Sequence, residues 1–235
     1  MQYYLDDDQL GRIIVKVRRG SHTLSARWHN EQLHVNVPNG TPTATLRQFL
    51  DAHRASILKH RRPAVSFHEG QVINCFGCSV TLGVQNHKPN HITIKHEGEN
   101  SIIVSLPVGT DFDSAHAKQN ISRVLQKLME QEAPKRLIPY ATQLAQRLGV
   151  SVKGFEIGRG KQKLGHCTAK GIIQLSRNVM FLPQYLVDLI ICHELAHLKH
   201  MNHSAAFHAL CNTYLGGREK QLEAQLKHFP WPILQ

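Results

Sequence analysis

The chain has 235 residues, of which 41% are hydrophobic and 19% are charged, so its composition is that of a folded globular protein and excludes an intrinsically disordered one. No stretch approaches the roughly 20 apolar residues that a membrane-spanning helix needs. The acidic N-terminus, with three aspartates at residues 6–8, does not resemble a secretory signal. Five cysteines are too few, and odd in number, for a disulfide scaffold, so we expect a reducing compartment, the cytoplasm.

Two further features of the composition bear on function. Lys and Arg total 28 and Asp and Glu total 17, which gives a net charge of +11. Such a charge permits binding to nucleic acid or to other anionic partners, but it does not specify a fold. The chain also contains 17 histidines, and histidine is the commonest metal ligand in proteins. Most of them are expected to lie on the surface, so spacing rather than number must identify a site.

The first part of the chain is predicted to be rich in β-strands. Short runs of β-branched or alternating apolar residues predict strands at residues 12–17, 23–28, 33–37, 71–75, 80–84, 91–95 and 102–106. One helix interrupts them. It is predicted to begin at Thr41-Pro42 and to end at Arg61-Arg62-Pro63.

The hydrophobic period becomes helical near Asp113. Residues 114–150 carry two apolar stripes, and Pro134 is predicted either to start a second helix or to kink a long one. Strands are predicted at 154–158 and 172–175, followed by a helix with Pro183 at its first position. No internal repeat is apparent in the sequence. We therefore predict an α+β fold with a β-rich domain at residues 1–113 and a mainly helical domain with a small sheet at 114–235.

The segment His193-Glu194-Leu195-Ala196-His197 is the most informative part of the sequence. On a helix, residues four apart differ by about 40°, so the two histidines point the same way and can share one metal ion. Glu194 lies beside the ion, where a carboxylate can hold a water molecule and take its proton. The H-E-x-x-H pattern arises by chance in about 5% of chains of this composition, so a third ligand at a suitable spacing is needed to support the site.

His203 is the preferred third ligand. It can reach the ion only if the helix ends near residues 199–200 and the chain folds back. Asn202 can adopt the left-handed conformation of a helix C-terminus, and Ser204 can cap a following helix.

His200 and His208 are the competing third ligands. The spacing of His203 is also that of the metzincins, but this chain has His200 where their pattern needs glycine, and no methionine follows Met201 to form their methionine turn.

The sequence resembles the YgjP-like zinc metallopeptidases, which are bacterial relatives of the SprT-like and WLM proteins. The segment C-H-E-L-A-H-L-K-H-M-N-H-S-A-A-F (192–207) looks like their active-site signature. The segment K-Q-K-L-G-H-C-T-A-K-G-I-I-Q-L-S (161–176) is similar to their W-G-S-C segment, and the R-R-G-S stretch at 18–21 also looks like the family. The resemblance covers nearly the whole chain.

The resemblance implies one zinc ion per chain held by His193, His197 and His203, with Glu194 as the catalytic base. It also implies a compact, gluzincin-like zinc peptidase domain at 114–235. The chain departs from the family where Leu164 and His166 stand in place of the Trp and Ser of W-G-S-C. If this segment borders the site, His166 adds a hydrogen-bond donor and a possible metal contact there.

Two further features of the sequence are weaker evidence for a function. Cys75-Phe76-Gly77-Cys78 is a single C-x-x-C without the second pair of a zinc ribbon, and we expect it to be structural. Residues 147–170 contain six Lys or Arg against Glu156 alone, which permits weak binding of nucleic acid without sequence preference.

The sequence therefore favours a zinc-dependent peptidase that hydrolyses peptide or protein substrates. Tyr214, His166 and His208 are candidates for the donor that stabilises the oxyanion or for a supporting role around the metal. The strand predicted at 172–175 is a candidate for pairing with an extended substrate. The alternatives are a non-catalytic zinc-containing protein that binds nucleic acid or a partner, and a protease that acts on DNA-bound proteins.

Overall fold

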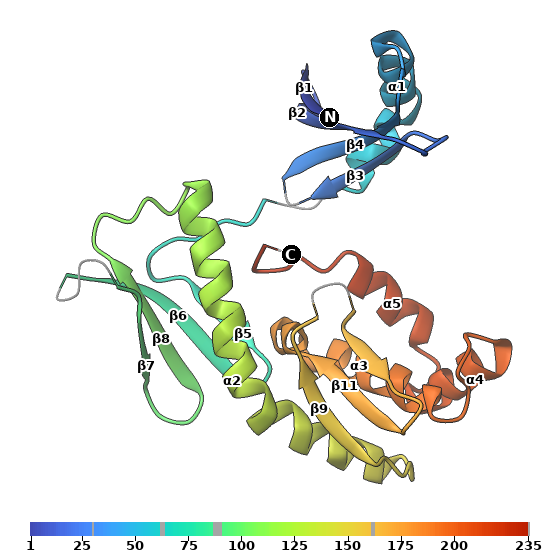
Figure 1. Cartoon of the computed structure of the whole chain (residues 1–235). Helices are drawn as coiled ribbons and strands as arrows, with labels where there is room; N and C mark the ends of the chain where they lie inside the picture. The colour runs from blue at the N-terminus through green and yellow to red at the C-terminus, as the bar shows by residue number, and fades with distance from the viewer. Residues whose placement is uncertain (30, 62–63, 87–90, 161–162, 235) are drawn as a thin grey trace. The chain divides into compact units, whose positions relative to one another are not determined.

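The computed structural model describes residues 1–29, 31–61, 64–86, 91–160 and 163–234 (Figure 1). The chain forms two compact units, Met1–Ala64 and Val65–Leu234, each with a hydrophobic core of its own. The boundary predicted at residue 113 therefore falls inside the second unit. The change of period there marks the start of a helix, and this helix shares one core with the strands that precede it.

The first unit is a four-stranded sheet with one helix. Its elements are β1 (Gln2–Asp7), β2 (Gly11–Arg18), β3 (Ser25–His29), β4 (Gln32–Pro38) and α1 (Thr43–Lys59). The strand order is β1-β2-β4-β3, in which β2 and β4 are parallel and the two outer pairs are antiparallel. Strand β1 was not predicted. The predicted end of the helix at 61–63 lies partly outside the described residues.

Alternation along the strands explains how this unit folds. Ile13 and Val15 in β2 and Val35 in β4 are fully buried, and they pack with Leu46 and Leu50 of α1. Their neighbours along each strand point to the opposite face of the sheet. The unit thus has one face covered by its helix and one face that its own residues leave open.

The second unit begins with the same arrangement. Its first elements are β5 (Val72–Cys75), β6 (Cys78–Gln85), β7 (Thr93–His96), β8 (Ser101–Pro107) and α2 (Ala115–Arg147). The strand order is β5-β6-β8-β7, again with a parallel central pair between two antiparallel pairs. The core positions correspond as well, since Ile102, Val104 and Leu106 of β8 occupy the places of three buried residues of β4.

The turn after the fourth strand is the same in both units. In Pro38-Asn39-Gly40-Thr41 and in Pro107-Val108-Gly109-Thr110, the threonine N–H and Oγ1 both donate to the proline carbonyl. The glycines have φ angles of 79° and 80°, a conformation that favours glycine. The chain therefore contains a repeated ββββα arrangement, and the expectation of no internal repeat was wrong.

Helix α2 is one continuous element of 33 residues with Pro134 and Pro139 inside it. Of the two predicted outcomes for Pro134, the structure thus has the long helix. The oxygen of Ser114 caps its first turn by accepting from the Ala117 N–H. The buried side of α2 joins both the β5–β8 sheet and the last part of the chain into one core.

The last part of the chain adds a small sheet and short helices. These are β9 (Gly154–Gly158), β10 (Gly165–Cys167), β11 (Ile172–Ser176), the 3₁₀ helix η1 (Arg177–Phe181), α3 (Gln184–His197), α4 (Ala205–Tyr214) and α5 (Glu219–Lys227). The sheet order is β10-β11-β9. The fold is thus mixed, with several small sheets and helices. Among the described residues, no helix is both long enough and apolar enough to span a membrane.

An ion pair joins β1 to α1 and gives the first unit a pH-dependent stability. Arg54 donates to both carboxylate oxygens of Asp7, at 2.8 and 2.9 Å. This interaction holds the pKa of Asp7 well below its usual value. A depressed carboxyl pKa stabilises the fold above pH of about 4, and the contribution is lost as the pH falls below that value.

We therefore expect Asp7→Asn to lower the free energy of unfolding of this unit by about 1 kcal/mol at pH 7 and pH 5, because the ion pair is only partly shielded from water. Below pH 4 the difference from wild type should shrink. The measurement is denaturant unfolding followed by Trp28 fluorescence in a Trp231→Phe background. Asp8→Asn, at an exposed neighbouring position, is the control, and an equal effect of both changes would contradict the assignment.

Candidate active site

The H-E-x-x-H segment lies at the C-terminal end of α3, a helix that is buried on almost all sides. Residues 186, 187, 189–192, 195 and 196 are all buried and apolar. The one acidic residue in its first half, Asp188, accepts a hydrogen bond from the Tyr140 hydroxyl of α2 at 2.5 Å. The helix is thus fixed in position by its apolar contacts and by this hydrogen bond.

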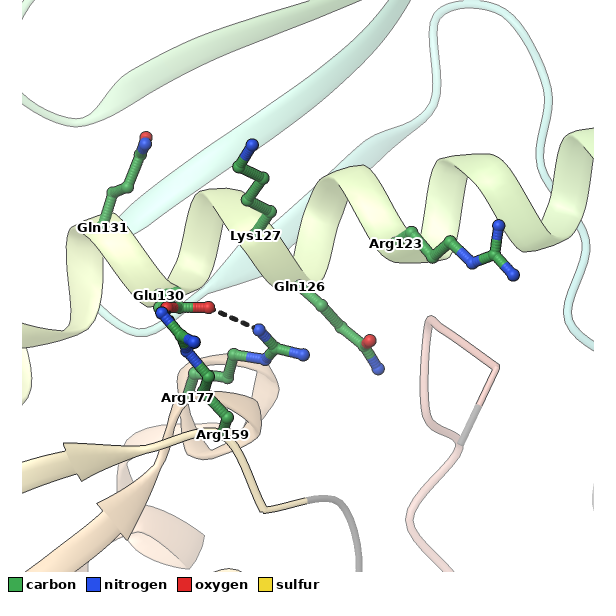
Figure 2. Close-up of a pocket in the computed structure, with 7 residues that line it drawn as sticks. All are labelled: Arg123, Gln126, Lys127, Glu130, Gln131, Arg159 and Arg177. Atoms are coloured by element: carbon green, nitrogen blue, oxygen red, sulfur yellow. Dashed lines mark hydrogen bonds and ion pairs between the residues drawn. The ribbon is translucent and has the colours of Figure 1, made fainter.

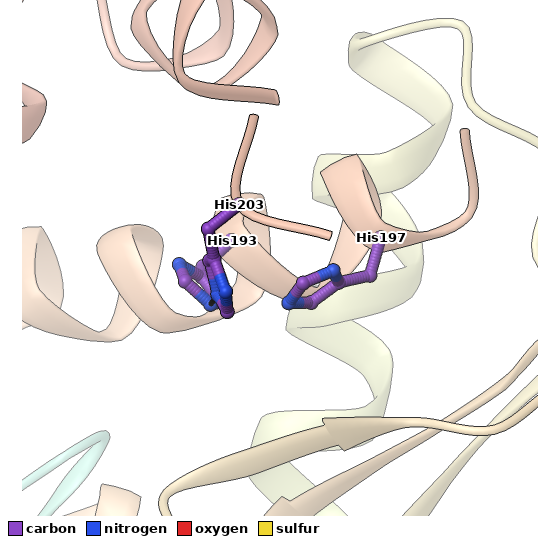
Figure 3. A group of neighbouring side chains, drawn as sticks. All are labelled: His193, His197 and His203. Atoms are coloured by element: carbon purple, nitrogen blue, oxygen red, sulfur yellow. Dashed lines mark hydrogen bonds between the residues drawn. The ribbon is translucent and has the colours of Figure 1, made fainter. Parts of the chain in front are cut away.

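Three imidazoles meet at one point. His193 and His197 project from the same side of α3, and His203 reaches the same place from the segment after the helix (Figure 3). Their ligand nitrogens all lie within 4.8 Å of one another, and Nε2 of His203 is 3.1 Å from Nε2 of His193. Two nitrogens bound to one tetrahedral zinc lie about 3.3–3.4 Å apart, so the separation fits two ligands of one ion.

The chain reverses direction between His197 and His203 to make this possible. Helix α3 ends at His197, slightly earlier than predicted, and residues 198–203 form a turn and bends. The Ser204 oxygen then accepts from the Phe207 N–H and caps α4, as the sequence predicted. Because α4 begins directly after His203, its cap helps to hold that histidine beside α3.

Two contacts hold the imidazoles in position. The ring of Phe207 is fully buried, and its centroid lies 4.6–4.9 Å from the centroids of all three histidine rings. Nδ1 of His197 lies 3.0 Å from the His200 carbonyl oxygen, which fits an Nδ1–H donor and leaves Nε2 free as a ligand. His200 thus contributes its backbone, and its ring is not part of the three-histidine group.

The protonation state of the imidazole rings allows them to bind a metal ion. Burial, with a smaller contribution from the neighbouring His197 and His203, lowers the pKa of His193 to about 4. Burial also lowers the pKa of His197. These rings are therefore neutral at pH 7, which leaves their lone pairs available to an ion. Within the described part of the chain, this is the one group of three or more His, Cys, Asp or Glu with such geometry.

Glu194 lies against strand β10. Its side chain is only 6% exposed, and burial raises its pKa to about 7. The backbone N–H of Cys167, which hydrogen bonds to the carboxylate, and the charge of Lys163 act in the opposite direction. A Cβ at Gly165 would lie 2.6 Å from Cγ of Glu194, closer than any real contact, so the carboxylate needs a glycine there. The segment similar to W-G-S-C thus borders the site through its backbone.

The strand predicted to pair with substrate is not available. Residues 172–175 lie in β11, which has β10 on one side and β9 on the other. That prediction was wrong, because both edges of β11 already have a partner. Strands β10 and β9 are the edge strands, and β10 is the one that lies against Glu194. Since Leu164 and Thr168 bond to β11, the backbone groups of Gly165 and Cys167 between them point to the free edge.

The three candidates for an auxiliary role have different surroundings. His166 is exposed on β10 and is near enough to lower the pKa of His197. Nδ1 of His208 lies 2.9 Å from the Glu219 carboxylate, and its ring centroid is 6.3 Å from that of His203. Tyr214 packs against the cluster of Ala196, Phe207 and Cys211 behind the histidines.

A separate cavity lies between α2, the end of β9 and η1, and none of the three histidines lines it (Figure 2). It has a volume of about 580 Å³ and is lined by Arg123, Gln126, Lys127, Glu130, Gln131, Arg159 and Arg177. Glu130 pairs with Arg159 and with Arg177, each at 2.6 Å. This carboxylate ties η1 and the end of β9 to α2. Arg159, one of the basic residues of the stretch at 147–170, is therefore paired with a carboxylate of α2.

Sequence reasoning missed the roles of Phe207, Gly165 and Cys167. The aromatic residue four positions after His203 was assigned only to the following helix, although its place one turn into that helix puts it behind the histidines. The contact of Gly165 and Cys167 with Glu194 spans almost 30 residues of chain, and no local pattern predicts such a pairing.

The close approach of Gly165 to Glu194 leads to a prediction about activity. In Gly165→Ala the new Cβ must displace the carboxylate, and we expect about a 10- to 100-fold loss of any hydrolytic kcat, because small misplacements of a catalytic group are costly. Metal content should not change, since no ligand moves. Gly154→Ala in β9, where a Cβ meets nothing within 4 Å, is the control. Equal activity of the two variants would show that β10 does not position Glu194.

A comparison with known proteins found a matching family. The family model of the YgjP-like metallopeptidase domain matches residues 22–229, which is most of the chain and includes all three histidines and Glu194. No match was found among curated proteins or among solved structures. The chain belongs to the YgjP-like metallopeptidase domain family.

Proposed function

We propose that the protein is a zinc-dependent peptidase with Glu194 as its general base. The observation that carries this proposal is that three imidazoles converge beside a buried carboxylate, which lies on the same helix as two of them. Neutral imidazoles at this spacing suit zinc, and three protein ligands leave a coordination position open, which is typical of catalytic rather than structural zinc. His193, His197 and His203 would hold one ion per chain.

When bound, zinc supplies Lewis-acid activation of water and of the scissile carbonyl. The chain's own groups move the proton. The Glu194 carboxylate takes a proton from the attacking water and gives it to the leaving nitrogen. The Cys167 N–H holds the carboxylate in place, and glycine at position 165 leaves room for it.

We further propose that the substrate is an extended peptide or protein segment that lies along the free edge of β10. The backbone groups of Gly165 and the carbonyl of Cys167 are directed there, and backbone pairing with an edge strand binds peptides irrespective of side chain. His166, exposed on the same strand, is the best placed of the three candidates for stabilising the oxyanion. His208 is engaged with Glu219, and Tyr214 packs behind the histidines.

The alternatives lack comparable support. A structural zinc site is usually closed by a fourth protein ligand, and the described residues provide a group of three. For a protease that acts on DNA-bound proteins, the described residues of the basic stretch at 147–170 provide no identified nucleic-acid surface beside the candidate site. The five cysteines are free thiols, which supports the expected cytoplasmic location.

Replacing the base tests the mechanism. We expect Glu194→Gln to keep zinc but to lose hydrolysis by at least about 100-fold, because an amide cannot accept the proton. The measurement is cleavage of casein and of a mixed peptide library, read by mass spectrometry, alongside zinc content. Glu223→Gln, at an exposed position of α5, is the matched control. Cleavage by Glu194→Gln at the wild-type rate would refute the mechanism.

Replacing single histidines tests the ligand set. We expect about one zinc per purified chain by elemental mass spectrometry, and loss of most of it in His203→Ala, because two remaining ligands are too few for tight binding. His208→Ala should keep its zinc, and so should His200→Ala, because that residue acts through its backbone carbonyl. Thermal unfolding of each variant shows whether a loss reflects the site or the fold. Full zinc in His203→Ala, with loss in His200→Ala, would reassign the ligand.

A further inference from the structure

The sheet of the first unit has one face that α1 does not cover, here termed the open face. Alternation places the outward side chains of all four strands on it, as the register of the paired strands requires. The open face comprises Gln2, Tyr4, Asp6, Arg12, Ile14, Lys16, Arg18, Ser25, Arg27, His29, Gln32, His34, Asn36 and Pro38. Its side chains are exposed or half-buried, in contrast to the fully buried side that faces α1.

The open face is basic. Four of its side chains are Lys or Arg, and Asp6 is the one acid, so its formal charge is 4 − 1 = +3. Among the described residues, none of the four cations forms an ion pair with a carboxylate. The charges therefore remain available to an anionic partner.

The open face also presents flat groups at which a base can stack. The Arg12 guanidinium lies over the Tyr4 ring, 4.4 Å from its centroid, and Tyr4 is 53% exposed. The rings of His29 and His34 are stacked, 5.3 Å apart with 17° between their planes. Arginine, tyrosine and histidine planes are the surfaces on which unpaired bases stack in protein complexes.

The repeat within the chain provides an internal comparison. Aligning the two sheets on their P-x-G-T turns places Val72, Asn74, Ser79, Thr81, Gly83, Gln85, Thr93, Lys95, Glu97, Ile103 and Ser105 at the corresponding outward positions of the second unit. One cation and one acid give that face a formal charge of zero, and it carries no aromatic or histidine ring. The ββββα arrangement itself thus requires neither the cations nor the rings, which are particular to the first unit.

We propose that the open face of the first unit binds single-stranded nucleic acid, with the cations on the phosphates and the flat groups against unpaired bases. An acidic protein partner would be attracted by the cations but would make no use of the flat groups. A nucleic acid presents both phosphates and bases, so it can use the cations and the flat groups together. Duplexes hide their bases and should bind more weakly. Tyr4, Arg12, Lys16 and Arg18 precede the residues that the family model matches, so about half of this surface lies outside that match.

The test is fluorescence anisotropy of the full chain with labelled dT20, U20 and a 20-base-pair duplex over a range of salt. Contacts of four cations with single-strand phosphates predict a slope of log Kobs against log salt of about −3. We expect dT20 and U20 to bind alike, since nothing in the surface selects the 2′-hydroxyl, and both to bind more tightly than the duplex at equal salt.

Two variants of equal charge locate the site. Lys16→Gln combined with Arg27→Gln removes two cations from the open face, and it should weaken binding at least tenfold and reduce the slope by about 1.4. Arg47→Gln combined with Lys59→Gln removes two exposed cations from α1, on the other side of the same sheet, and should change binding less than twofold. Circular dichroism and thermal unfolding show that both variants fold.

A third variant tests stacking. Tyr4→Leu keeps an apolar side chain but removes the ring, and it should weaken dT20 binding at least about fivefold while leaving the salt slope unchanged. The proposal is wrong if no oligonucleotide binds at low salt, or if the two charge variants behave alike. It is also wrong if poly-glutamate binds as tightly as dT20, because the surface would then select charge and fit an acidic protein.

Discussion

Burying a carboxylate on an apolar helix is costly, and much of the second unit is arranged around Glu194. Burial raises the pKa of this group to about 7, and a hydrogen bond from the Cys167 N–H is the main compensation. That bond requires β10 to run against α3, which in turn requires glycine at position 165. Strand β10 is held in place by β11, and β11 by β9, so the small sheet supports this side chain as well as contributing to the hydrophobic core.

The sequence predicted those parts of the candidate site that depend on residues close together in the chain. Helical geometry alone aligns His193 with His197, and a serine cap after a short turn is enough to place His203 beside them. The rest depends on contacts between distant segments. Nothing within a few residues of Glu194 indicates that β10 will reach it, and the central position of β11 follows from the order of strands in a sheet, which the sequence of one strand does not contain.

The strands of both large sheets were predictable from alternation, apart from β1. That strand alternates Tyr3, Leu5 and Asp7 toward the helix, and the last of these is half-buried in an ion pair with Arg54 rather than in an apolar core, which obscures the pattern. The repeat was hidden for a related reason. Corresponding core positions share apolar character but seldom identity, and the four-residue turn with its invariant proline, glycine and threonine is the clearest common feature.

The repeat also marks the point in the chain where the two units stop corresponding. Helix α1 has 17 residues, and the first 17 residues of α2 end at residue 131 (115 + 16), just before Pro134 and Pro139. The prolines cannot donate to the carbonyls of Glu130 and Lys135, so the hydrogen-bond ladder of α2 is interrupted at the point where the shared frame stops. The repeated frame thus ends inside α2, and α3 and its small sheet, which carry the candidate site, have no counterpart among the described elements of the first unit.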